Sequence, residues 1–189
     1  AAEKIYSGIG DPAKVDININ LNNSTLYWLP KELILFDNSK LRRNINVNLS
    51  DNSNLIFCET SIFGRKAMSE KIKNISLSDQ WKINVNSSLK HFEAINMQGS
   101  MIDNYKNNYT FDNQSSLSTI IIFGEIIHQF ESELRKIIEN IVNHYCGMTK
   151  FDDKIIIRCI ANDNYDLKKT LNFIMKNIIH DKLPKSWDL

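Results

Sequence analysis

The chain has 189 residues, which is enough for one domain, or two small ones, with a sizeable hydrophobic core. It carries 23 lysines and arginines against 22 aspartates and glutamates, so a formal net charge of +1 gives no reason to expect nucleic acid or an acidic membrane as a partner. No apolar run approaches the roughly 20 residues of a transmembrane helix, and the N-terminus lacks the basic-then-apolar pattern of a signal peptide, so the expected compartment is the cytoplasm.

Alternating apolar and polar residues predict β-strands along the first part of the chain. An alternating strand, a polar turn and a second extended segment follow one another three times, which we interpret as three copies of a hairpin-like unit. Such weak repetition predicts a ladder of stacked strands. Strands are predicted at residues 15–21, 25–29, 31–36, 44–49, 55–63, 81–85 and 89–97.

Two glutamates occupy equivalent positions in this repeat. Glu59 stands four residues after Leu55, and Glu93 stands four residues after Leu89. Because side chains return to the same face every two residues, the two glutamates are predicted to share a face of the stacked units. Ionised carboxylates in that arrangement need a proton, a partner or a cation. His91 shares the face of Glu93 and would add a nitrogen ligand for a metal ion.

The pattern changes in the last third of the chain, where apolar residues recur at helical spacing. We expect a mainly β protein in which residues 1–124 form the sheet ladder and residues 125–189 form a helix–strand–helix part of the same single domain. Strands are predicted at 118–123 and 154–160, and helices at 125–146 and from Asp163 or Asn164 to Pro184.

The cysteines and other reactive side chains match no catalytic pattern. Cys58, Cys146 and Cys159 are widely separated and predict no disulfide framework. Cys58 lies among apolar residues, where a thiol stays protonated and inert. His144 and Cys146 match no standard zinc spacing, so no structural metal is expected. A glycine-rich phosphate-binding loop is also absent from the sequence.

The residues alone leave several functions open. Arg65 and Lys66, in the turn after residue 64, would bind an anion or the acidic patch of a partner, or simply be solvated. Glu59 and Glu93 would bind a cation, or solvate one face of a β-sheet binding or structural protein with no metal role. As the acid/base pair of an enzyme they would need a roomy pocket and perturbed pKa values.

Five segments, in their order and spacing, carry a family resemblance. They are YWLPKELILFDNSKL at 27–41, FGRKAMSE at 63–70, LKHFEAINM at 89–97, IIIRCIAND at 155–163 and LPKSW at 183–187. Together they resemble the urease accessory protein family UreD, also called UreH, across essentially the whole chain. The opening AAEKIY is similar to a point well inside the family pattern, which implies that the family's N-terminal portion is missing.

The resemblance implies a non-catalytic maturation factor with a helix-like stack of strands and two helices. Its expected partners are the urease apoprotein and UreF, with the GTPase UreG reached through UreF, and neither nucleic acid nor membrane. No tightly bound cofactor is expected. Nickel in transit would pass through an internal water-filled tunnel, and the family's tunnel acids fall on Glu59 and Glu93. Spaced carboxylates with water between them bind an ion weakly at several sites, as a conduit requires.

Overall fold

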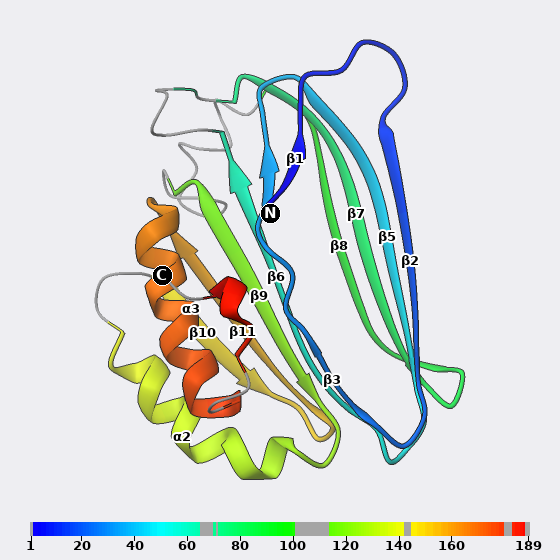
Figure 1. Cartoon of the computed structure of the whole chain (residues 1–189), viewed down its shortest axis with the longest axis vertical. Helices are drawn as coiled ribbons and strands as arrows, with labels where there is room; N and C mark the ends of the chain where they lie inside the picture. The colour runs from blue at the N-terminus through cyan, green and yellow to red at the C-terminus, as the bar shows by residue number, and fades with distance from the viewer. Residues whose placement is uncertain are drawn as a thin grey trace.

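The computed structural model describes residues 2–64, 70, 72–100, 114–141, 145–179 and 183–187. Over these residues the protein has three layers, with two β-sheets face to face and two helices on the outer face of one sheet (Figure 1). The helices are α2 (Ile127–Glu139) and α3 (Asn164–Ile179), and a short 3-10 helix, η3 (Lys185–Trp187), follows α3. None of the described helices is long and apolar enough to cross a membrane. The mainly β fold with two α-helices agrees with the prediction.

The strands divide between the two sheets in a way that positions the interior side chains. Within the described residues one sheet has seven strands in the order β1-β4-β6-β9-β11-β10, with β3 also paired to β6, and the other has four in the order β2-β5-β7-β8. The strands are β1 (Glu3–Ile5), β2 (Ala13–Leu21), β3 (Thr25–Trp28), β4 (Leu33–Leu35), β5 (Ser39–Leu49), β6 (Asn54–Phe63), β7 (Asn74–Val85), β8 (Ser88–Ser100), β9 (Ser116–Phe123), β10 (Tyr145–Lys150) and β11 (Lys154–Ala161).

The predicted repeat is real in its first two units, although these units are not hairpins. β2 and β5 lie parallel in the four-stranded sheet, and the strands that follow them, β3 and β6, lie parallel in the seven-stranded sheet, with Leu26 opposite Leu55. Each unit therefore crosses from one sheet to the other. The third unit differs, because β8 folds back antiparallel on β7 in the same sheet. Glu59 and Glu93 consequently lie on different sheets, and their predicted repeat equivalence is wrong.

Two kinds of apolar core stabilise the layers. One lies between the helices and the seven-stranded sheet, where Ile120, Ile155 and Leu167 are fully buried. The space between the sheets contains two further apolar clusters. The first includes Leu33, Leu35, Leu41, Phe63, Ile75 and Leu77, and the second includes Ile45, Val47, Leu55, Phe57, Trp81, Ile83, Ile121 and Phe123.

The predicted helix over 125–146 is too long. Helix α2 ends at Glu139, because the Asn140 N–H bonds the carbonyl of Ile137 and the Asn140 side chain donates to the carbonyl of Lys136 at 2.7 Å. The chain then returns as β10, which pairs antiparallel with β11. The helix–strand–helix part thus adds two strands to the sheet that contains β6 and β9.

The β10–β11 pairing also corrects the prediction of no disulfide. Cys146 and Cys159 lie directly opposite each other on these strands, with their Cα atoms 4.2 Å apart, and form a disulfide. A separation of 13 residues is bridged by the tight turn between the strands. Cysteine usage therefore gives no argument for a reducing compartment.

Candidate functional site

A layer of polar side chains crosses the interior between the two sheets and separates the two apolar clusters there. On β5, Arg43 stands between Leu41 of the first cluster and Ile45 of the second. On β7, Asp79 stands between Leu77 and Trp81 in the same way. Since these side chains are two residues apart on strands, all of them face the opposing sheet. We define this polar layer as Arg43, Glu59, Asp79, His91, Glu93, Thr119 and Arg158.

Strand register aligns five members of the layer, whereas Glu93 and His91 lie further along β8, opposite Trp81 and Ile83 of the second cluster. Arg43 and Asp79 are opposite each other on β5 and β7. On the facing sheet, Glu59 is opposite Thr119, which in turn is opposite Arg158 on β11. Residues in register point to the same side of a sheet, so each sheet presents a polar row to the other.

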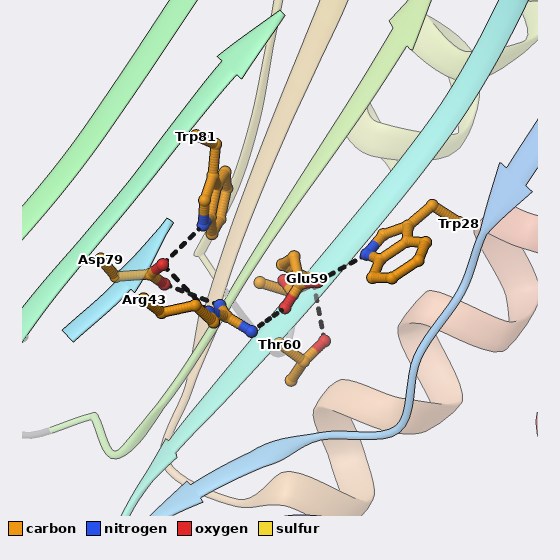
Figure 2. A network of polar contacts seen from close by, with 7 residues as sticks. Trp28, Arg43, Glu59, Thr60, Asp79 and Trp81 are labelled. Atoms are coloured by element: carbon orange, nitrogen blue, oxygen red, sulfur yellow. Dashed lines mark hydrogen bonds and ion pairs between the residues drawn. The ribbon is translucent and has the colours of Figure 1, made fainter. Parts of the chain in front are cut away.

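Glu59 lies at the deep end of the layer, in a network that Figure 2 shows from close by. Its side chain is 2 % exposed and accepts hydrogen bonds from Arg43 Nη1 at 2.9 Å and from Trp28 Nε1 at 2.7 Å. Arg43 also donates to Asp79 through Nε at 3.0 Å and Nη2 at 2.7 Å. Trp81 Nε1 donates to the same Asp79 carboxylate at 2.9 Å. One guanidinium thus holds two buried carboxylates, one from each sheet.

The electrostatics of this network favour a cation or a proton. Two carboxylates share one arginine, so the ionised network carries a net negative charge in a buried place. Burial raises the pKa of Glu59, and the charge of Asp79 acts in the same direction, whereas Arg43 and Trp28 oppose the shift. For Arg43, burial alone would lower the pKa, but Glu59 and Asp79 outweigh it and raise the pKa further.

Glu93 lies at the outer end of the layer and is held by a different arginine. Arg158 donates to both carboxylate oxygens, from Nη1 to Oε1 at 3.0 Å and from Nη2 to Oε2 at 2.6 Å. Arg158 Nη1 is also 3.3 Å from Thr119 Oγ1. The Glu93 side chain is 12 % exposed and that of Arg158 is 47 % exposed, so this pair borders on solvent.

His91 adds a buried nitrogen beside this pair. Its Nε2 is 3.7 Å from Glu93 Oε2 and has no hydrogen-bond partner among the described residues. Burial alone would raise the pKa of Glu93, but His91 and Arg158 lower it to about 2. The carboxylate is therefore ionised at neutral pH and lies next to an imidazole nitrogen that has no hydrogen bond among the described residues.

The structure brings the three predicted metal residues into one layer, by a route different from the predicted one. Glu59 projects from the seven-stranded sheet, while Glu93 and His91 project from the four-stranded sheet toward it. Thr119 lies between Glu59 and Arg158 in the register of the seven-stranded sheet, and Arg158 binds Glu93. Among the residues that the structure describes, no cluster of three or more His, Cys, Asp or Glu side chains could hold a metal ion. The donors available at the outer end are one carboxylate and one imidazole, which suit a borderline divalent ion.

Other predicted residues lie elsewhere. Arg65, Lys66 and His144 fall outside the described residues. Cys58 faces the helix-side core, 3.6 Å from Ser118 Oγ, and burial raises the pKa of its thiol to about 12, so the thiol stays protonated.

Sequence reasoning missed the positive half of the layer. Arg43 and Arg158 both stand at inward positions of strands whose inward neighbours are apolar, and Asp79 interrupts the same alternation on β7. A charged residue at the apolar phase of a strand was the available signal, because such a group needs a partner on the facing sheet.

Comparisons with known proteins cover the whole chain. A family model described as UreD urease accessory protein matches residues 1–186. Three similar proteins, each named urease accessory protein UreD, come from Rhizobium rhizogenes, Rhizobium leguminosarum bv. viciae and Roseobacter denitrificans. The first is 28 % identical over 191 residues, the second 27 % over 191 and the third 27 % over 192. In each case the match covers 100 % of this chain and 69 % of the relative.

Proposed function

The chain belongs to the UreD urease accessory protein family, and we propose that within urease maturation it conducts nickel toward the urease active site. Its role is accessory rather than catalytic. Nickel is the cargo of this process, and no tightly bound cofactor is part of the proposal. We propose the cytoplasm as its compartment, where it would bind the urease apoprotein.

The polar layer is the observation that supports nickel conduction. A sandwich of two sheets is stable with an apolar interior, yet here carboxylates from both sheets project into the interior, Glu59 and Asp79 between the two apolar clusters and Glu93 beside the second. Glu93 and His91 lie next to Arg158, whose side chain is 47 % exposed, and we propose this end as the entrance. Glu59 lies deeper, in a network with excess negative charge. Separate weak sites of this kind attract an ion without trapping it.

The partners we propose are the urease apoprotein and UreF, with UreG reached through UreF. Arg65 and Lys66 remain the proposed contact with an acidic partner surface. For UreF we propose the exposed face of α3, where Tyr165 and Phe173 are each 57 % exposed. Large exposed aromatic side chains are enriched at protein interfaces, which supports this placement.

The test is delivery of nickel to urease by protein variants in cells that depend on this chain. Glu93→Gln and His91→Gln should each lower the nickel content of purified urease several-fold, while the variant still co-purifies with the apoprotein. Glu131→Gln is the matched control, since Glu131 on α2 is also paired with basic residues but lies outside the layer. A normal nickel content in both layer variants would reject conduction and favour the alternative, a β-sheet binding protein with no metal role.

A further inference from the structure

The contacts of Glu93 hold a positive group in the place that a metal ion would take. The planar guanidinium of Arg158 binds both Glu93 oxygens, at 3.0 and 2.6 Å, and reaches Thr119 Oγ1 at 3.3 Å. A cation bound by a carboxylate in two-oxygen fashion would need the same oxygens. Arg158 and a metal ion are therefore competitors for one ligand.

His91 is a second and independent sign of a ligand at this position. The residue is 9 % exposed, and its Nε2 finds no hydrogen-bond partner in the described part of the chain. That nitrogen is directed at the cluster, 3.7 Å from Glu93 Oε2, which is too long for a hydrogen bond. Buried polar atoms in folded proteins nearly always make a hydrogen bond, so an imidazole nitrogen whose contact with the carboxylate is this long needs an explanation. A metal ion between the two atoms supplies one.

Arg158 and Arg43 differ in how easily they can leave. The Arg43 side chain is 3 % exposed and is fixed to two buried carboxylates by three hydrogen bonds. The Arg158 side chain is 47 % exposed, and its ion pair is with one acid only. Because the Arg158 side chain is already 47 % exposed, it can turn into water by giving up its contacts with Glu93 and Thr119, and an incoming cation would replace it on the Glu93 carboxylate. Arg43 cannot.

On the basis of the proposed nickel role, we propose that Arg158 is a displaceable latch over a divalent cation site formed by Glu93 and His91. Without the ion, the guanidinium neutralises Glu93 and closes the outer end of the polar layer. A borderline divalent ion such as Ni²⁺ takes the carboxylate and the imidazole nitrogen, and the Arg158 side chain turns to solvent. The latch keeps the resting affinity low, which favours onward transfer over storage.

The experiment measures Ni²⁺ binding to the untagged protein by isothermal titration calorimetry, without urease or any other partner. Arg158→Gln should bind Ni²⁺ at least about tenfold more tightly than the unsubstituted chain, because the competitor and its repelling charge are gone. Adding Glu93→Gln or His91→Gln to that variant should abolish the increase in Ni²⁺ affinity. Arg135→Gln is the matched control, since Arg135 on α2 is 48 % exposed and also pairs with a glutamate. It should leave Ni²⁺ binding unchanged.

The possible outcomes separate the latch from the cation site. Equal affinity of the unsubstituted chain and Arg158→Gln, with binding that still needs Glu93 and His91, would overturn the latch and leave the site intact. Ni²⁺ binding that is indifferent to Glu93 and His91 in every variant would overturn the site and with it the proposed conduction. Thermal unfolding checks each variant, and Arg158→Lys, which loses the two-pronged contact, is the second variant if Arg158→Gln unfolds early.

Discussion

Removal of the Arg43 side chain is the most direct test of the buried end of the polar layer. Arg43→Met keeps a stem of similar length but deletes three charge-assisted hydrogen bonds, one to Glu59 and two to Asp79. Breaking a buried pair by removing one partner typically costs about 3–5 kcal/mol, because the remaining charge stays buried. We therefore expect the free energy of unfolding to fall by about 3–5 kcal/mol.

Urea denaturation followed by circular dichroism measures this change, and a thermal scan should show a Tm lower by about 6 to 20 °C for a protein of this size. Arg135→Met is the control. Its side chain is 48 % exposed, so we expect a change within about 0.5 kcal/mol. A loss below about 1 kcal/mol for Arg43→Met would refute the view that Arg43 neutralises two buried acids.

The same variant has a pH signature with a definite sign. Burial already raises the pKa of Glu59 above its ordinary value, and Arg43 opposes that shift. Without Arg43 the folded-state pKa rises further. A raised folded-state pKa contributes stability at low pH that is lost as the pH rises through it, so the deficit of Arg43→Met should be smaller at about pH 5 than at about pH 8. A deficit that is equal at both values would contradict this assignment of charge.

Two further predictions concern the outer end of the layer and the C-terminal helix. The pKa of Glu93 is lowered from 4.5 to about 2. The ionised carboxylate therefore adds to the free energy of unfolding above pH 4.5, and this contribution is lost as the pH falls through about 2. Glu93→Gln should therefore lower the free energy of unfolding by about 1 kcal/mol at neutral pH, after allowance for solvent screening. In strong acid the substitution should change it by almost nothing. Urea titrations at both pH values measure the difference. Phe173→Ser should reduce co-purification of UreF several-fold. The Tm should stay unchanged, because Phe173 is 57 % exposed. Unchanged co-purification would exclude the outer face of α3 as the contact.

Local patterns predicted most strands because one face of each is apolar. The alternation over β2 and the apolar run of β9 correspond directly to burial in the structure. Prediction failed where a charged or helix-terminal residue interrupts the pattern. Asp79 breaks the apolar phase of β7, so its first half was missed, although Ile75 and Leu77 before it alternate correctly. The Asn140 cap and the edge strand β10 were hidden within a continuous helical periodicity.

The candidate site was predicted only in its acidic half. Family resemblance and sequence position selected Glu59, Glu93 and His91, and all three enter the polar layer. Their arginine partners come from strands on the facing sheet, 16 residues away for Arg43 and 65 residues away for Arg158. No local periodicity encodes which strand faces which across a sandwich. The pairing therefore depends on topology, and the antiparallel return of β8 was the step that sequence spacing did not reveal.

The layer is difficult to explain as a stabilising feature. Replacing buried ion pairs by apolar side chains of similar volume is often neutral or stabilising by about 1–4 kcal/mol, and apolar clusters already lie on both sides of the layer. The fold therefore does not require charge at this level. Its two arginines also differ in exposure. Arg43 is buried between two acids, whereas Arg158 is half exposed and binds one acid, next to a histidine whose Nε2 has no hydrogen bond in the described part of the chain. The proposed cation path gives this difference a use, because the positive group at its outer end can be displaced while the one at its buried end is fixed.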